Sequence, residues 1–270
     1  MVRKLERLSA SGLKKYQDCP KQFYLYYLSN VPEPEEGVIE HFEVGNAVHD
    51  SIENVLKTRP ELIDDEEELF NAFVKEEDTL GYEYSDDEKV LNCFETASRW
   101  ISSFVVDVNH VEEEWIMEKD GMKWKGFADL VANIEMNDVT YENVIVDWKT
   151  GKETEEWKEV IQSGMYIEMF WDKFGSYPEG AVFVYLDEET QSFHPRISDG
   201  EVFWNEHENK YWTEIDRIKS KIMLSEQNNN WQADPESKKC FFCDHKLFCQ
   251  DSPVGAENVN QSHISIGGSI

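Results

Sequence analysis

The chain has 270 residues, enough to bury the core of one large domain or two modest ones. Its 56 acidic and 26 basic residues give a formal net charge of −30, which argues against a nucleic-acid binder with an overall basic surface. Because it lacks a run of about 18 apolar residues and an apolar segment near Met1, we expect a cytoplasmic protein without a membrane span or signal peptide.

The acidic residues are unevenly placed, with dense blocks at 61–68 and 76–88, while lysines gather elsewhere. Such blocks are usually solvated surface that favours solubility. Alternatively, they repel a polyanion toward a local basic groove, or they contact a protein partner. Net charge does not decide between these interpretations.

The first part of the chain predicts helices. Ser9 or Ser11 fits the N-cap of a first helix, and Pro20 fits the first turn of a second helix that carries the aromatic residues of 23–27. A loop is expected over 31–37. Apolar residues at helical spacing predict further helices over 42–57, 65–79 and 87–108.

The pattern then changes to strands. Residues 111–135 predict two strands around a Lys-Asp-Gly turn. After them we expect a strand over 141–148, a helix over 155–175, a strand over 181–186, one or two hairpin strands in 191–204 and a helix over 204–224. A helix between the third and fourth strands makes those strands parallel. The sequence therefore predicts an α/β fold with a mixed sheet, covered by helices from both ends.

Asp147 and Lys149 follow the apolar strand residues Val144–Val146. Strand side chains alternate, so the two point the same way and Trp148 points oppositely. Alone, this pair is most simply a salt bridge at the end of a strand. The same geometry also suits a metal ligand beside a lysine that stabilises an oxyanion.

Asp129 is expected on the strand next to Asp147. Two neighbouring carboxylates without a basic partner repel each other, and a hard cation such as Mg²⁺ or Mn²⁺ removes that penalty. The alternative is an ion pair of Asp129 with Lys123 or Lys125.

His49 lies on the apolar stripe of its helix, one turn after Gly45. A single inward histidine is often a hydrogen-bonded core residue. It becomes a third ligand only if this helix packs against the ends of the two acidic strands.

Four short motifs follow one another along the chain: G-x-x-x-H, G-x-x-D, D-x-K-T-G and Q-x-x-x-Y. They comprise Gly45 and His49, Gly126 and Asp129, Asp147 to Gly151, and Gln162 and Tyr166. The set resembles the PD-(D/E)XK nuclease superfamily in its RecB-like branch. The resemblance implies a restriction-endonuclease-like αβββαβ core with added N-terminal helices and a C-terminal iron–sulfur segment.

The resemblance also implies roles for these residues. His49, Asp129, Asp147 and the Trp148 carbonyl would bind Mg²⁺ or Mn²⁺, and Lys149 would be the catalytic lysine. Gln162 and Tyr166 would position the nucleic-acid strand or the active-site loop. Glu112, Glu113 or Glu114 is a candidate for an extra acid, and the sequence does not choose among them. Ala128 replaces the proline that usually precedes the first acid.

The cysteines form a second group, with Cys240-x2-Cys243-x5-Cys249 near the C-terminus and Cys19 far away. Thiolates suit either a [4Fe–4S] cluster or zinc. The resemblance to CRISPR-associated and other iron–sulfur exonucleases favours the cluster. Cys93 is expected in the core.

The resemblance implies a metal-dependent DNA exonuclease that acts on single-stranded ends, with 5′-to-3′ polarity, like phage or CRISPR-associated relatives. The alternative is a non-catalytic DNA-end-binding or scaffold subunit of a recombination or CRISPR-adaptation complex, with a protein partner at the acidic surface. We expect one nuclease domain over 1–252, a helical insert at about 58–108, a Cys-rich segment at 238–250 joined to Cys19, and a flexible tail over 253–270.

Overall fold

The computed structural model describes residues 4–31, 40–84, 86–153, 155–241, 243 and 245–253, without the side chains of 40–43, 237 and 238. The chain divides into two compact units, Ile39–Glu214 and the combination of Met1–Val38 with Ile215–Ile270. The single domain over 1–252 stays a prediction, and both the loop over 32–37 and the tail over 254–270 fall outside the described residues. No helix of the described part is long and apolar enough to cross a membrane.

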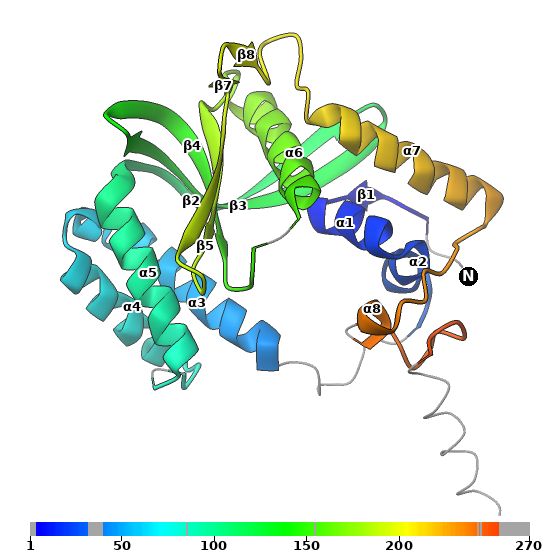
Figure 1. Ribbon diagram of the computed structural model, residues 1–270, viewed down its shortest axis with the longest axis horizontal. Helices are drawn as coiled ribbons and strands as arrows, with labels where there is room; N and C mark the ends of the chain where they lie inside the picture. Colours follow the sequence, from blue (N-terminus) through cyan, green and yellow to red (C-terminus); the bar gives the residue numbers. More distant parts are fainter. Residues whose placement is uncertain are drawn as a thin grey trace, which may run out of the picture. The chain divides into compact units, whose positions relative to one another are not determined.

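The larger unit contains a sheet with α6 over one face and α3, α4 and α5 grouped against the other (Figure 1). Its helices are α3 (Glu40–Thr58), the 3-10 helix η1 (Pro60–Asp64), α4 (Glu66–Leu80), α5 (Glu88–Phe104) and α6 (Glu156–Phe174). Its strands are β2 (Val105–Lys119), β3 (Met122–Met136), β4 (Val139–Lys149), β5 (Gly180–Tyr185), β6 (Thr190–Pro195), β7 (Ile197–Ser198) and β8 (Glu201–Val202).

The sheet of this unit is mixed, as predicted. β2 and β3 form a long antiparallel hairpin, whose turn residues Asp120 and Gly121 both have positive φ. β4 pairs antiparallel with β3 and parallel with β5, and β5 pairs antiparallel with β6. α6 is the crossover between the parallel pair, so the αβββαβ core is confirmed.

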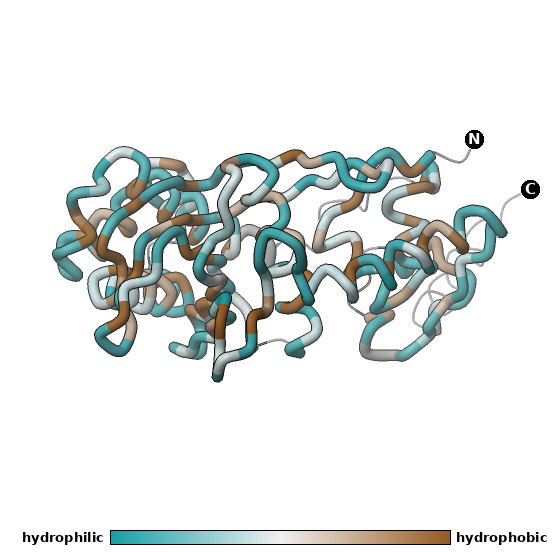
Figure 2. Tube along the Cα trace, turned by 90° about the horizontal axis from the view of Figure 1, so that it is seen from above, coloured by the Kyte–Doolittle hydropathy of each residue, from teal (hydrophilic) through white to brown (hydrophobic). Residues whose placement is uncertain are grey.

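The core of the larger unit lies between the sheet and α3 to α5. The Trp148 ring packs edge-on against Trp100 of α5, with ring centroids 5.4 Å apart. Asp65 and Asp87 cap α4 and α5 by accepting hydrogen bonds from first-turn amides. Figure 2 shows hydrophobic stretches inside the traced chain and hydrophilic turns at its margins.

Two predicted boundaries in this part were wrong. The helix expected over 87–108 ends at Phe104, because the β-branched residues from Val105 enter β2. The helix expected from 204 begins only at Trp212. Trp204 instead forms a bridge with Asn209 and donates from its ring nitrogen to the Pro178 carbonyl at 3.0 Å, a tertiary contact without a local sequence signal.

The smaller unit joins the two ends of the chain. It contains β1 (Arg7–Leu8), α1 (Ala10–Asp18), α2 (Pro20–Tyr27), most of α7 (Trp212–Asn228) and α8 (Ser237–Phe241). Ser9 caps α1 as predicted, since its hydroxyl accepts from the Gly12 amide. The Trp231 ring stacks on Phe23 and Tyr24, with centroids 5.8 and 5.6 Å apart. Of the α2 rings, Phe23 is therefore core, Tyr24 and Tyr27 are half-buried, and Tyr26 is 48% exposed.

Candidate active site

His49 and Asp129 meet in the larger unit. His49 Nδ1 on α3 lies 3.5 Å from Asp129 Oδ2 on β3. The His49 side chain is 32% exposed, so it is not an enclosed core histidine. Helix α3 therefore packs against the acidic strand in the way that the ligand hypothesis required.

Asp129 is held from a second side by the backbone. The Trp148 amide donates to Asp129 Oδ2 at 2.7 Å, which ties β3 to the end of β4. Lys125 instead pairs with Glu114 at 2.8 Å. The ion-pair alternative for Asp129 therefore does not hold for Lys125.

Asp147, Lys149 and α6 form the other half of the site. The Asp147 carboxylate contacts the Lys149 ammonium and accepts a hydrogen bond from Gln162 Nε2. Gln162 Oε1 lies 3.4 Å from Lys149 Nζ, and Gln162 Nε2 lies 3.0 Å from the Tyr166 hydroxyl. The Gln162 amide thus contacts all three of the other residues that the D-x-K and Q-x-x-x-Y motifs single out.

The glycine of the G-x-x-D motif has a steric role. A Cβ on Gly126 would lie 2.8 Å from Tyr166 Cε1 and 3.1 Å from both Met165 and Met169. Only glycine lets α6 approach β3 this closely. At the G-x-x-x-H motif, a Cβ on Gly45 would lie 3.4 Å from the Thr150 hydroxyl, an ordinary contact distance, so Gly45 is near the turn after β4 without being required by it.

The charges of this site are strongly coupled. Burial lowers the pKa of His49, but the carboxylates of Asp129 and Asp147 raise it further, and the net shift is upward. Burial raises the pKa of Asp129, but His49 and Lys149 lower it by more. Burial and the two aspartates raise the pKa of Tyr166 well above its ordinary value, so its phenol stays protonated.

Glu112 is the acid that the structure selects from the three consecutive glutamates. Glu113 pairs with Lys173 at 2.8 Å and Glu114 with Lys125, whereas Glu112 lines an open pocket of about 470 Å³ with His49 and Asp129. The flanking pairs Val111↔Leu130 and Glu113↔Ala128 place Glu112 opposite Asp129. Glu112 has a left-handed backbone (φ 41°), and burial together with Asp129 raises its pKa to about 7.

The donor set suits a hard divalent cation, because imidazole nitrogen and carboxylate oxygen from three elements face one pocket. In the described part of the chain, no three His, Cys, Asp or Glu side chains converge as a preformed metal site. Each aspartate has a basic partner: Lys149 balances Asp147, which agrees with the salt-bridge interpretation of the D-x-K pair, and His49 balances Asp129.

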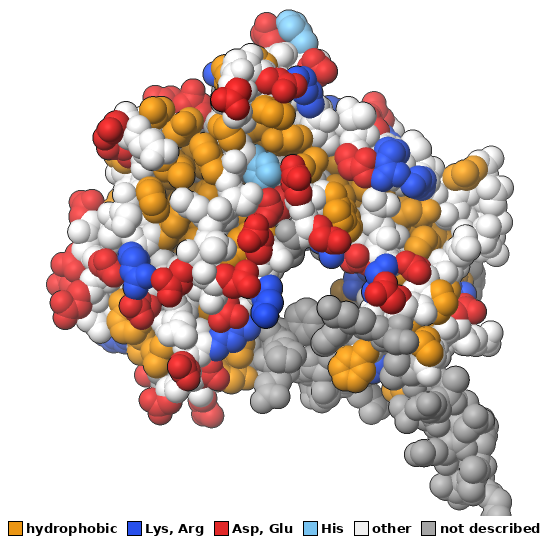
Figure 3. Space-filling model, in the orientation of Figure 1, with side chains coloured by type: hydrophobic (Ala, Val, Ile, Leu, Met, Phe, Trp, Pro, Cys, Tyr) orange, Lys and Arg blue, Asp and Glu red, His pale blue; other side chains and the backbone are white. Residues whose placement is uncertain are grey.

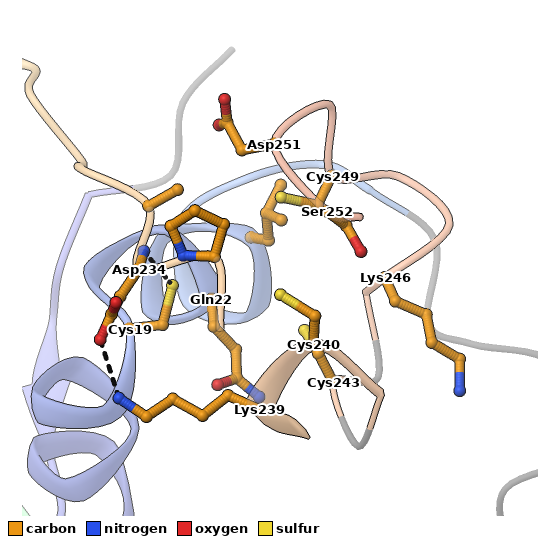
Figure 4. Close-up of a pocket in the computed structure, with 13 residues that line it drawn as sticks. Cys19, Gln22, Asp234, Lys239, Cys240, Cys243, Lys246, Cys249, Asp251 and Ser252 are labelled. Carbon is orange, nitrogen blue, oxygen red and sulfur yellow. Dashed lines mark hydrogen bonds and ion pairs between the residues drawn. The ribbon is translucent and has the colours of Figure 1, made fainter. Parts of the chain in front are cut away.

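The four predicted cysteines gather in the smaller unit. Cys19, Cys240, Cys243 and Cys249 line one pocket (Figure 4). The Asp234 amide donates to Cys19 Sγ at 3.4 Å. Burial raises the pKa of the Cys240 thiol, and the neighbouring thiols of Cys249 and Cys19 raise it further. Four thiols that line one pocket suit a cationic group that favours their thiolate forms, although within the described residues they do not converge as a preformed metal site. Cys93 lies apart, fully buried in the core, and burial raises its pKa to about 12.

The mixed sheet, its αβββαβ order and the acidic residues at its strand ends define a restriction-endonuclease-like fold. The chain belongs to the PD-(D/E)XK nuclease superfamily, which matches residues 7–250. Nucleases of this superfamily typically use divalent metal ions such as Mg²⁺, and the fold implies a DNA substrate.

Two solved structures are similar in outline. A candidate exonuclease from Eubacterium rectale shares 18% identity, with 85% of this chain and 84% of that chain covered and a TM-score of 0.43. A protein called SSO0001 shares 14% identity, with coverages of 80% and 97% and a TM-score of 0.36. A comparison with curated proteins finds no match.

Proposed function

We propose that the protein is a Mg²⁺- or Mn²⁺-dependent DNA exonuclease of the RecB-like branch that degrades single-stranded DNA from its ends, with 5′-to-3′ polarity. The observation that carries the proposal is the convergence of four separate motifs. His49, Asp129, Asp147 and Lys149 come from three elements, and Gln162 of a fourth element contacts the last two.

In this proposal, His49, Asp129, Asp147 and the Trp148 carbonyl hold the metal, with Glu112 as an additional carboxylate at the pocket. A bound divalent ion would polarise the scissile phosphate and lower the pKa of an attacking water. Lys149 neutralises charge that develops on the phosphate oxygens. Gln162 restrains the Lys149 ammonium, and the protonated Tyr166 packs behind the amide of Gln162.

The test is degradation of end-labelled single-stranded DNA in Mn²⁺ and in EDTA. We expect Mn²⁺-dependent shortening by the wild type, and a loss of about 10²- to 10³-fold in kcat for Lys149→Ala, because a charge at the transition state is removed. Lys152→Ala is the matched control, since it removes an exposed lysine three positions later.

The substrate's form tests the rest of the proposal. Early release of a 5′-terminal label indicates 5′-to-3′ polarity, and circular single-stranded DNA should resist an exonuclease. A wild type that binds DNA ends but does not cut them in Mn²⁺ would contradict the proposal and favour the scaffold alternative.

The second part of the proposal is a structural [4Fe–4S] cluster held by Cys19, Cys240, Cys243 and Cys249. The common pocket of these thiols supports it, and the resemblance favours iron–sulfur over zinc. A brown protein with iron and acid-labile sulfide is the expected result. A colourless protein with stoichiometric zinc would overturn the choice of metal.

A further inference from the structure

One face of the β2–β3 hairpin carries exposed apolar side chains next to the candidate active site. Phe127 is 41% exposed and Ile116 is 64% exposed. Ile116 lies opposite Lys125 in the strand register, so these side chains form one patch, with Phe127 two residues further along β3. Exposed apolar side chains that gather in a patch, rather than scatter singly, mark interaction surfaces.

This face is not the one that α6 covers. Trp124 and Ala128 are buried, and Gly126 lies against Tyr166 of α6. Strand side chains alternate, so Phe127 and Lys125 point away from α6. The buried neighbours fix which face of β3 each residue occupies, and this leaves the Phe127 side chain exposed.

Phe127 stands close to the proposed cutting site. Asp129 follows it by two residues on the same strand, a separation of about 7 Å along β3. That distance corresponds to about two stacked nucleotides at ~3.4 Å each. A nucleotide next to the scissile phosphate is thus within reach of the Phe127 ring.

The charge around the ring is mixed, because Glu114 lies directly opposite Phe127 in the strand register and Glu118 lies opposite Lys123. Lys125 Nζ lies 4.7 Å from the Phe127 ring centroid, and Lys123 is exposed further along the same strand. Lys125 also pairs with Glu114, so its charge is partly balanced. In a chain with a net charge of −30, long-range attraction for DNA is absent, and contacts that do not depend on charge become important.

We propose that Phe127 is a base-stacking platform that, with Lys125 beside it, binds an unpaired nucleotide of single-stranded DNA next to the active site. The proposal rests on the proposed nuclease function and names its substrate form. An aromatic face stacks on unpaired bases of any sequence, whereas the bases of a duplex are already stacked on each other. Phe127 thereby selects single-stranded over double-stranded DNA.

The test is the affinity of the full-length protein for a dye-labelled single-stranded oligonucleotide, measured by anisotropy in Ca²⁺, alongside cleavage in Mn²⁺. Phe127→Ala should weaken binding by about 5- to 100-fold, the value of one stacked base, and Phe127→Trp should restore it. Trp171→Ala is the matched control, because Trp171 is an aromatic residue of α6 that is also 41% exposed. The affinity for a blunt hairpin duplex should change less than about twofold.

A second substrate separates stacking from a general effect on the fold. Abasic nucleotides near the end should weaken wild-type binding to the level of Phe127→Ala, and should leave Phe127→Ala unchanged. Unchanged single-strand affinity in Phe127→Ala, or an equal loss in Trp171→Ala, would overturn the proposal. So would a wild-type dimer that Phe127→Ala converts to a monomer without any effect on DNA. A wild type that cuts no DNA would instead contradict the proposed function itself.

Discussion

Gln162 contacts both charged residues of the D-x-K motif, Asp147 and Lys149. Its amide nitrogen donates to Asp147 and its amide oxygen accepts from Lys149, so its orientation is fixed by two opposite charges. The side chain is 6% exposed, which keeps water from competing for these contacts. Gln162 of the Q-x-x-x-Y motif therefore restrains Lys149 and Asp147 together, which in the proposed function are the catalytic lysine and a metal ligand.

If His49 binds metal as proposed, its raised pKa gives metal binding a pH dependence. A metal-binding imidazole must be neutral, so protons compete with the metal. The affinity for Mn²⁺ should increase by up to about tenfold per pH unit below the His49 pKa and level off above it, when measured by calorimetry between about pH 5.5 and 8.5. His49→Asn should bind Mn²⁺ more weakly and with a flatter pH profile. An unchanged pH profile in His49→Asn would contradict this role.

The same shifts affect the stability of the metal-free protein. Because the folded pKa of His49 is raised, its pair with Asp129 stabilises the fold below the ordinary histidine pKa, and this contribution is lost as the pH rises through the folded value. The lowered pKa of Asp129 has the opposite sense, since its contribution is present above the ordinary aspartate pKa and is lost in acid. As the pH rises from the ordinary histidine pKa to the raised pKa of His49, metal affinity should therefore increase while the stability of the metal-free protein decreases.

At the residue scale, the sequence predicted which side chains would come together but not how their charges are balanced. The resemblance grouped His49, Asp129, Asp147 and Gln162 in one site, whereas the contact of Gln162 with Asp147 was not predicted. Glu112 could not be chosen, because three consecutive glutamates carry the same chemistry. The structure distinguishes it by its backbone conformation, its register opposite Asp129, its place in the pocket and the ion pairs that occupy its two neighbours.

At the scale of elements, the contact between α6 and β3 sets the geometry of the site. Gly126→Ala would place a Cβ 2.8 Å from the Tyr166 ring. We expect a loss of about 1–3 kcal/mol in the free energy of unfolding, from overpacking, together with reduced cleavage as Gln162 and Tyr166 shift. Urea denaturation gives the first quantity.

Gly151→Ala is the control for that substitution, because no atom lies within 4 Å of its added Cβ. It should change the free energy of unfolding by less than about 0.5 kcal/mol. If the two variants were equally stable, the added Cβ at Gly126 would not be destabilising. That result would contradict the steric role of Gly126.

The helices and strands were predictable where a clear hydrophobic period or a turn motif marks them. Their ends were less predictable. The α6 crossover and the Asp-Gly hairpin turn follow from periodicity and turn chemistry. The start of β2 at Val105 was missed because the apolar spacing of α5 continues into it. The late start of α7 depends on Trp204 and Asn209, whose buried side chains hydrogen-bond to distant carbonyls.

At the scale of the whole molecule, most of each acidic block is surface, as the solubility interpretation expects, whereas Glu77 is fully buried and accepts a hydrogen bond from the Tyr84 amide at 2.5 Å. Residues 64–68 and 86–88 are exposed. Figure 3 shows acidic side chains over much of the face in view, including the region of α4 and α5. This charge distribution opposes non-specific DNA binding, so the affinity for DNA must come from the site and the surfaces beside it.

In the smaller unit, contacts that do not involve a metal hold the two ends of the chain together. The Lys21 amide donates to the Gln232 carbonyl at 3.2 Å, and the Tyr16 hydroxyl lies 2.9 Å from the Ser225 hydroxyl. The spacing of the cysteines predicted this closure without indicating the aromatic and polar contacts that support it. A cluster shared by Cys19 and Cys240 would close a loop of more than two hundred residues.

Cys19→Ser tests that closure. In the chain-entropy description, closing such a loop is worth roughly 5 kcal/mol, so the variant should lose its bound metal and unfold at lower temperature and denaturant concentration. Cys93→Ala should keep the metal, because Cys93 is buried in the core of the other unit. Full metal content in Cys19→Ser would contradict the four-cysteine site.

The central claim is that His49, Asp129 and Asp147 form one divalent metal site. An anomalous-scattering map from crystals soaked in Mn²⁺ tests it most directly. We predict a peak in contact with these three side chains, beside Lys149, that disappears in Asp129→Ala. A wild-type protein that cuts DNA in Mn²⁺ while its Mn²⁺ peak lies away from all three residues would contradict the claim.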